Sequence, residues 1–196
     1  MLKLTSWIFR ILLLIPFVWL GWEFYSDQIG ADPAKYLNHK MGQWALYYLL
    51  INLVIGALIS YSVKFPKFLR FLLINRRWLG VTTFFYLIFH FLLYLTLEGF
   101  EKQAFTQILD KTYLLLGSSA GMILLILAMT SNNFSVKKLG AKNWKRLHRS
   151  VYVASALITV HVLLIEKADL IKYGILFSLL WVLQLPRLFY IKSFKK

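Results

Sequence analysis

The chain has 196 residues, of which 59% are hydrophobic and 16% charged, and its net charge is +15. Because a soluble domain is nearer a quarter charged, this composition excludes an ordinary soluble protein and leaves room for about six membrane spans of ~20 residues. The absence of cysteine excludes disulfides, thiolate metal sites, iron–sulfur clusters and a cysteine nucleophile.

Apolar runs alternate with polar connections along the whole chain. The first run follows Lys3, contains Arg10, and is longer than the core of a cleavable signal peptide, so we predict a span there. Asp32-Pro33 in the next connection is typical of a turn. No internal repeat and no broken helix is apparent. We therefore predict an all-α membrane protein, a single six-helix transmembrane bundle over residues 1–196. The predicted spans are about 7–24, 42–63, 78–97, 113–131, 147–165 and 173–190.

The charges predict the orientation of this bundle. With six spans, the two termini and the basic connections over 64–77 and 132–146 share one side, which carries most of the 23 Lys and Arg residues. All eight acidic residues lie on the other side. Since an excess of Lys and Arg marks the cytoplasm, both termini are predicted to be cytoplasmic. The high net charge is then a topology signal, which argues against nucleic acid as a partner.

Two histidines lie inside predicted spans, where an ionisable side chain indicates a functional site. His90 follows Trp78 by twelve residues in the third span, and His161 follows His148 by thirteen in the fifth. Both would lie roughly 18–20 Å from the cytoplasmic edge. Two imidazoles at one level can ligate one haem iron from both sides, which suits electron transfer. Alternatively, each histidine bonds a neighbouring helix or lines a proton path, and spacing alone leaves both readings open.

The cytoplasmic ends of the spans carry further candidates. His148 could ligate an inner haem, line a site for another redox cofactor, or lie at the interface near lipid phosphates. Arg76, Arg77 and Arg149 could pair with haem propionates or a flavin phosphate, although anionic membrane lipid is the plainer partner for most basic residues here. His39, in the connection before the second span, could be an interfacial side chain or a propionate contact.

The fourth span contains a run of small residues over 117–121. Such a run suits tight helix packing or the close approach of a flat cofactor. Packing alone is the favoured reading.

Several segments carry a family resemblance. The segments GADPAKYLNHKMGQWALYYLL, RRWLGVTTFFYLIFH, KTYLLLGSS and LAMTSNNFSVKKLGAKNWKRLHRSVYV resemble the MsrQ (YedZ) family, of the wider ferric-reductase-like transmembrane group. The resemblance runs from about Ile8 to Tyr190, with LGAKNWKRLH and GADP as its specific stretches. MsrQ is the haem-binding membrane subunit of the bacterial periplasmic methionine sulfoxide reductase system.

The resemblance implies a multi-pass b-type cytochrome of the bacterial inner membrane. It would take electrons from the quinol pool or a cytoplasmic flavin reductase. It would pass them to the periplasmic molybdopterin subunit MsrP, which reduces methionine sulfoxide in oxidised proteins. Sulfoxide reduction itself is expected on that partner, so no catalytic residue is assigned to this chain.

The resemblance also implies cofactors. The family's haem histidines match His90, His148 and His161, and the family is associated with FMN. Two-haem relatives carry another histidine on the cytoplasmic side of the third-span ligand, where this chain reads Asn75-Arg76-Arg77. We therefore expect one haem b on His90 and His161. A second haem on His148, or a flavin in that layer, stays open.

Other classes of protein fit some of these patterns. A stand-alone ferric-reductase-like haem protein would reduce metal ions or oxygen directly. A haem-free, proton-coupled transporter would use His90 and His161 as a proton relay. A haem-free assembly subunit is the third alternative.

Overall fold

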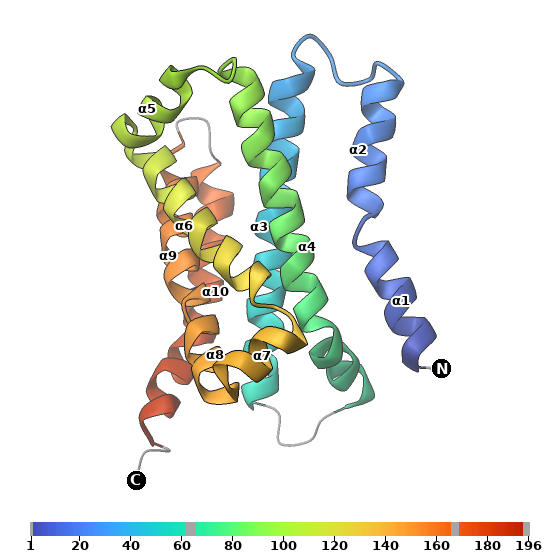
Figure 1. Ribbon diagram of the computed structural model, residues 1–196, viewed down its shortest axis with the longest axis vertical. Coiled ribbons are helices and arrows are strands. Elements are labelled where there is room, and N and C mark those ends of the chain that lie inside the picture. Colours follow the sequence, from blue (N-terminus) through green and yellow to red (C-terminus); the bar gives the residue numbers. More distant parts are fainter. Residues whose placement is uncertain (1, 62–65, 166–168, 194–196) are drawn as a thin grey trace. The chain divides into compact units, whose positions relative to one another are not determined.

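The computed structural model describes residues 2–61, 66–165 and 169–193, and this part of the chain contains helices and no strand (Figure 1). The predicted all-α class is therefore confirmed. Lys64, Glu166 and the tail after residue 193, which entered the charge argument, lie outside the described residues. The helices are α1 (Leu2–Leu12), α2 (Ile15–Tyr25), α3 (Pro33–Tyr61), α4 (Lys67–Leu97), α5 (Lys102–Asp110), α6 (Thr112–Met129), α7 (Asn133–Leu139), α8 (Ala141–His148), α9 (Val151–Leu163) and α10 (Leu170–Ser193).

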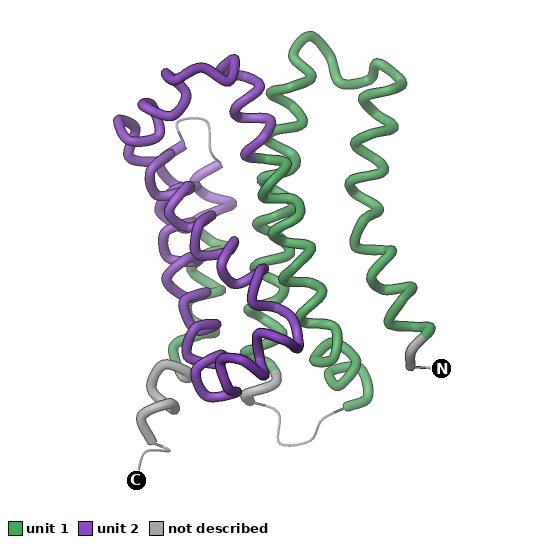
Figure 2. Tube along the Cα trace, in the orientation of Figure 1, with its two compact units in different colours: residues 1–90, 175–196 green, residues 91–174 purple. Residues whose placement is uncertain are grey.

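The chain divides into two compact units (Figure 2). Unit 1 comprises residues 1–90 and 175–196, and unit 2 comprises residues 91–174. His90 belongs to unit 1, whereas His148 and His161 belong to unit 2. Each unit is described by itself below.

The first predicted span of unit 1 is broken into α1 and α2 at Leu13 and Leu14, contrary to the expectation that no helix is broken. The break has a local cause. Pro16 lies in the first turn of α2 and has no backbone N–H, so the carbonyl of Leu12 loses its usual partner four residues along.

Two tyrosines of unit 1 restore hydrogen bonds at this break. The Tyr86 hydroxyl accepts from the backbone N–H of Phe17 at 3.0 Å and donates to the carbonyl of Leu13, also at 3.0 Å. The Tyr48 hydroxyl donates to the same carbonyl at 2.8 Å. Tyr86 is fully buried. Both tyrosine hydroxyls thus bond the Leu13 carbonyl, which the break separates from its usual helical partner, the N–H of Phe17.

The helices α3 and α4 of unit 1 run antiparallel, since Asn38 bonds His90 near one end and Asn52 bonds Arg76 near the other. The core of this unit includes Leu53 on α3, which is 3% exposed. The amide of the buried Gln184 on α10 donates to the Leu53 carbonyl at 3.1 Å.

The polar connections that the sequence predicted before α3 and before α4 are largely helical in the structure. The helix α3 begins at Pro33 because Asp32 caps it, accepting from the backbone N–H of Lys35 at 3.1 Å, so Asp32-Pro33 starts a helix rather than a free turn. The helix α4 begins at Lys67, within the predicted basic loop. A polar sequence ends a membrane span but does not end a helix, because water can solvate the side chains of a helix that continues past the bilayer.

Unit 2 is built on α6 and α9, which pack along each other. The predicted mixed connection before α6 contains the short helix α5. The predicted basic connection after α6 contains α7 and α8. Asn132 starts α7 by accepting from the backbone N–H of Ser135 at 2.7 Å. Both loops were therefore predicted with too little helix.

Four helical stretches among the described residues are long and apolar enough to cross a membrane. A further apolar helix, Leu170–Leu185, is shorter. These findings support a membrane protein, while the count of six spans and the cytoplasmic termini stay predictions. The four stretches are Leu4–Tyr25, Pro33–Leu58, Lys67–Leu97 and Thr112–Met129.

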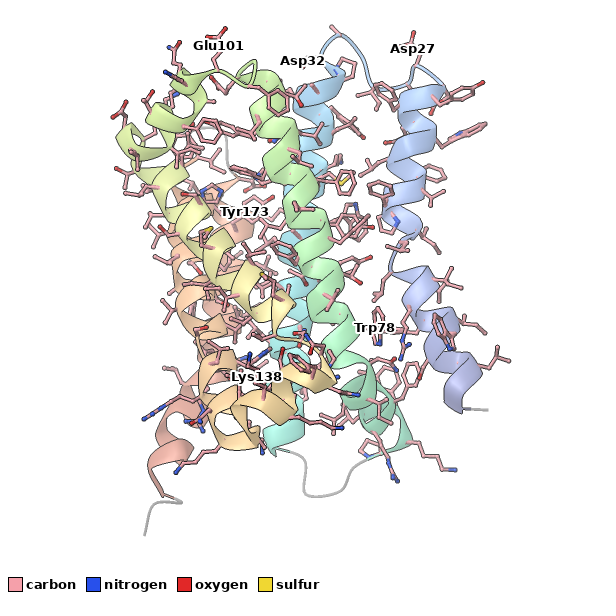
Figure 3. All side chains as sticks on the ribbon, viewed as in Figure 1. Asp27, Asp32, Trp78, Glu101, Lys138 and Tyr173 are labelled. Carbon is pink, nitrogen blue, oxygen red and sulfur yellow. The ribbon has the colours of Figure 1, made fainter. Side chains whose placement is uncertain are left out.

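Within each unit, the described acidic residues lie at one end and the strongly basic segments lie at the other. In unit 2, Glu101 precedes α5 at one end and Lys138 lies on α7 at the other (Figure 3). In unit 1, Asp27 and Asp32 lie in the connection between α2 and α3, away from the basic start of α4 (Figure 3). This separation is what the positive-inside pattern predicts for each unit.

Candidate functional sites on the histidine-bearing helices

In unit 1, His90 of α4 is fixed against α3 by two reciprocal hydrogen bonds. The ring Nδ1 of His90 lies 2.8 Å from the backbone carbonyl oxygen of Asn38, and the Asn38 side-chain amide donates to the backbone carbonyl of His90 at 2.8 Å. Gly42 lies under the ring, because a Cβ built there would lie 3.0 Å from both Nδ1 and Cε1. The imidazole therefore reaches the helix backbone only because residue 42 has no side chain.

In unit 2, His161 of α9 is held against α6 by the same construction. Its Nδ1 lies 2.6 Å from the backbone carbonyl oxygen of Tyr113. A Cβ built on Gly117 would lie 2.8 Å from Nδ1 and from Cε1. The Tyr113 ring lies beside the imidazole, with centroids 6.2 Å apart. The small-residue run at 117–121 thus opens with a glycine whose role is packing, against the histidine itself.

We use the term carbonyl–glycine notch for a backbone carbonyl at position n of a helix together with a glycine at position n+4 of the same helix. In an α-helix the carbonyl at n already accepts from the N–H at n+4, so residue n+4 lies directly beside that oxygen. A side chain at n+4 can obstruct a second donor to that oxygen, and a glycine there leaves the approach open. Asn38 with Gly42, and Tyr113 with Gly117, are two such notches, one in each unit.

The notch determines which ring nitrogen carries the proton. A carbonyl oxygen only accepts hydrogen bonds, so Nδ1 of His90 and of His161 must be protonated. In a neutral imidazole the lone pair then resides on Nε2. Metal-ligating histidines in proteins are oriented in this way, with the other ring N–H donated to a carbonyl or carboxylate. Both residues therefore fit the chemistry of an axial haem ligand.

A third notch in unit 1 holds an asparagine. The Asn52 amide donates to the carbonyl of Arg76 at 3.1 Å, and a Cβ built on Gly80 would lie 3.3 Å from the same amide nitrogen. The Arg76 Nε–H donates to the Asn52 side-chain oxygen at 3.0 Å. The guanidinium of Arg76 is thus oriented, whereas Arg77 on α4 and Arg149 after α8 are exposed.

His148, at the end of α8 in unit 2, is bound differently. Its Nε2 lies 3.2 Å from the Thr130 hydroxyl oxygen, and that hydroxyl donates its proton to the Ile126 carbonyl at 2.7 Å. The His148 Nε2 must therefore be the donor. The Trp144 indole stacks on the ring with centroids 3.9 Å apart and donates to the Thr130 carbonyl at 2.8 Å. The protonated nitrogen is thus the opposite one from His90 and His161.

His39 lies within α3 rather than in a connection. It is exposed, and its Nε2 is 2.9 Å from the Gln43 amide nitrogen one turn along the same helix. Among the described residues there is no group of three or more His, Cys, Asp or Glu side chains that would form a metal site without haem.

Sequence reasoning singled out the histidines but missed the groups that position them. Tyr113 and Gly117 lie in a predicted span, whereas Asn38 was placed in a connection just before Gly42. In both cases the n, n+4 spacing identifies a notch only when the facing donor is known. Since the backbone oxygen is the acceptor, the identity of residue n leaves no signal in the sequence.

Comparison with known proteins places these sites in a family context. Residues 41–159 match the family described as ferric reductase like transmembrane component. The protein-methionine-sulfoxide reductase heme-binding subunit MsrQ of Rhodospirillum rubrum is 36% identical over 178 residues, which are 89% of this chain and 83% of that protein. The subunit of the same name from Caulobacter vibrioides is 36% identical over 85% of this chain and 80% of its own length. The magnetosome protein MamZ of Magnetospirillum gryphiswaldense is 36% identical over 76% of this chain, but only 24% of its own length is covered.

Proposed function

Because the chain belongs to the MsrQ family, within the ferric-reductase-like transmembrane group, we propose that it is the haem-binding membrane subunit of a methionine sulfoxide reductase system. The observation that carries this proposal is the pair of notched histidines. Two imidazoles on two apolar helices each donate Nδ1–H to a helix carbonyl and carry the lone pair on Nε2, the arrangement found in metal-ligating histidines.

His90 and His161 would together hold one b-type haem. When bound, the haem would supply one-electron redox chemistry. Their joint use rests on the sequence, in which each follows the start of its predicted span by a similar number of residues. The notches orient the two rings and keep their protons on Nδ1, so each Nε2 can bind iron without losing a proton.

The electron donor would deliver electrons at the basic end of the protein. We propose that Arg76, oriented by Asn52, together with Arg77 and Arg149, binds anionic groups there, either haem propionates or the phosphate of FMN. The electron donor would be quinol or a cytoplasmic flavin reductase. A second haem on His148 would require its Nε2 to leave Thr130, or iron to bind Nδ1 instead.

The opposite end would face the periplasm of a bacterial inner membrane. There the acidic connections would meet the molybdopterin subunit MsrP, on which sulfoxide reduction takes place. The membrane subunit would thus serve the repair of oxidised periplasmic proteins.

The absorption spectrum of the purified protein tests the haem proposal. Reduced-minus-oxidised spectra are expected to show b-type bands that His90→Ala and His161→Ala each abolish. His39→Ala is the matched control, because His39 is an exposed histidine on the same helix as the Asn38 notch. Folded protein without haem, or full haem retention in both variants, contradicts the proposal.

The partner proposal has its own test. Affinity capture of the tagged membrane subunit from solubilised membranes is expected to retain a periplasmic molybdoprotein. Capture of a cytoplasmic partner alone contradicts the assignment to a methionine sulfoxide reductase system.

A further inference from the structure

The seam between α1 and α4 in unit 1 contains two buried polar atoms without hydrogen-bond partners among the described residues. They are Nε of Arg10 and the side-chain oxygen Oδ1 of Asn75. Asn75 is only 1% exposed. A buried donor or acceptor that stays unpaired costs about 1–3 kcal/mol, so a protein rarely keeps both in one seam unless something bonds them.

Neighbouring contacts bring these two groups to the same seam. The Asn75 amide donates to the Ser6 hydroxyl at 3.2 Å, and Ser6 lies one turn before Arg10 on α1. The Arg10 guanidinium carbon lies 4.5 Å from the ring centroid of Trp78, one turn after Asn75 on α4, and 5.1 Å from that of Trp7. Figure 3 shows Trp78 on the side of α4 that faces α1.

Among the described residues, the charge of Arg10 has no acidic counterpart in the seam. Its contacts among the side chains that the structure describes are with the two indoles, and none is an ion pair. Guanidinium–indole contacts stabilise a cation but do not neutralise it. A cation within a predicted span is costly unless an anion or water compensates it.

The face of α1 beside the seam is suited to lipid. Leu4, Ile8 and Ile11 are 67%, 48% and 64% exposed, and Trp7 is 59% exposed. Such a helix face is suited to contact with acyl chains, and tryptophan is enriched where acyl chains meet headgroups. A ligand of this seam would therefore come from the bilayer.

The ligand must bring an anionic acceptor for Arg10 and a hydrogen-bond donor for Asn75. We propose that the seam binds one anionic phospholipid with a hydroxyl-bearing headgroup, that is, phosphatidylglycerol. Because both atoms are buried in the seam, the headgroup has to displace the Arg10 side chain to enter. Its phosphate then accepts from Nε of Arg10, and a glycerol hydroxyl donates to Oδ1 of Asn75. A water molecule or a quinol would satisfy both atoms but would leave the charge of Arg10 uncompensated.

Native mass spectrometry of the delipidated full chain tests this site with three added lipids. Phosphatidylglycerol carries the charge and the hydroxyl, phosphatidylmethanol carries the charge alone, and phosphatidylcholine is zwitterionic without a hydroxyl. The wild type is expected to retain phosphatidylglycerol about tenfold over phosphatidylcholine, and severalfold over phosphatidylmethanol.

Substitutions of Arg10 and of Asn75 are expected to change lipid retention in different ways. Arg10→Gln removes the preference over phosphatidylcholine, and Arg10→Lys, which keeps a cation but lacks Nε–H, weakens it. Asn75→Leu keeps that preference but no longer distinguishes phosphatidylglycerol from phosphatidylmethanol. Arg70→Gln, the same substitution at an exposed site on α4, changes neither.

Three results in this experiment overturn the proposal. The first is equal retention of phosphatidylglycerol and phosphatidylcholine by the wild type. The others are a loss of phosphatidylglycerol in Arg70→Gln as large as that in Arg10→Gln, and an unchanged preference for phosphatidylglycerol over phosphatidylmethanol in Asn75→Leu. Displacement of bound phosphatidylglycerol by an equimolar short-chain quinol also overturns it, because the seam would then be a quinol site.

Discussion

The imidazole of His161 lies so close to the backbone of Gly117 that any larger residue there would overlap the ring. A Cβ at this position would be 2.8 Å from Nδ1, a separation at which one of the two groups must move. Gly42 and His90 repeat this relationship at 3.0 Å in the other unit. The glycines therefore set how close each histidine comes to the carbonyl that orients it.

Gly117→Ala is expected to lower haem content and thermal stability, because the added methyl displaces the His161 ring from the Tyr113 carbonyl. Overpacking of this kind costs about 1–3 kcal/mol. Gly42→Ala is expected to act in the same direction with a smaller effect. Haem per chain, measured from the reduced-minus-oxidised spectrum, and a thermal melt provide the measurement. Gly174→Ala in α10, where nothing lies within 4 Å, is the control and should retain both haem and stability.

Asn38→Ala separates the two bonds between Asn38 and His90. The substitution removes the side-chain amide that donates to the His90 carbonyl but leaves the backbone carbonyl that orients the ring. We expect a stability loss of about 1 kcal/mol with haem retained. Asn143→Ala, at an exposed asparagine whose amide donates to the Leu139 carbonyl four residues before it, should cost less. Complete haem loss in Asn38→Ala would show that the amide, rather than the carbonyl, positions the ligand.

Tyr86→Phe is expected to destabilise the protein more than Tyr48→Phe. Loss of the Tyr86 hydroxyl leaves the Phe17 N–H without its acceptor, while the Leu13 carbonyl keeps Tyr48. Loss of the Tyr48 hydroxyl leaves that carbonyl bonded to Tyr86. An unpaired buried donor costs about 1–3 kcal/mol, against about 1 kcal/mol for one lost bond. Thermal melts of the two variants and of Tyr25→Phe, whose ring is 83% exposed, give the order, and a reversed order would contradict it.

Three of the four histidines, His90, His148 and His161, are expected to show two different tautomers in haem-free protein. With neutral imidazoles, nitrogen-15 chemical shifts should report protonated Nδ1 for His90 and His161, and protonated Nε2 for His148. Thr130→Val removes the acceptor of His148 and should change the His148 signals alone. A protonated Nδ1 on His148 in the wild type would mean that Thr130 does not orient this ring.

Some of this structure follows directly from residue patterns. Long apolar runs predict helices, and His90 and His161 are conspicuous because polar rings are costly in such runs. The helix start at Asp32 was misread because Asp-Pro begins turns and helices alike, and only the bond to the Lys35 N–H distinguishes the two. Pro16 was the available signal for the broken first span.

The positioning groups could not be predicted in the same way. A notch is formed by a backbone oxygen and by the absence of a side chain at the glycine, so it appears only when two helices are placed together. Likewise, nothing in an apolar run indicates that Arg10 and Asn75 each keep a buried atom with no hydrogen-bond partner in the described part of the chain. Such features depend on which helix faces which, and hydrophobic periodicity does not carry that information.

The break between α1 and α2 has a consequence for biogenesis. A helix that is interrupted at Leu13 exposes backbone groups that lipid cannot solvate, so the first hydrophobic segment is incomplete as a membrane anchor on its own. It becomes complete only when Tyr48 and Tyr86, which are translated later, reach it. The N-terminal segment should therefore settle into the bilayer after the segments that follow it, and a generic hydrophobic helix should not substitute for it.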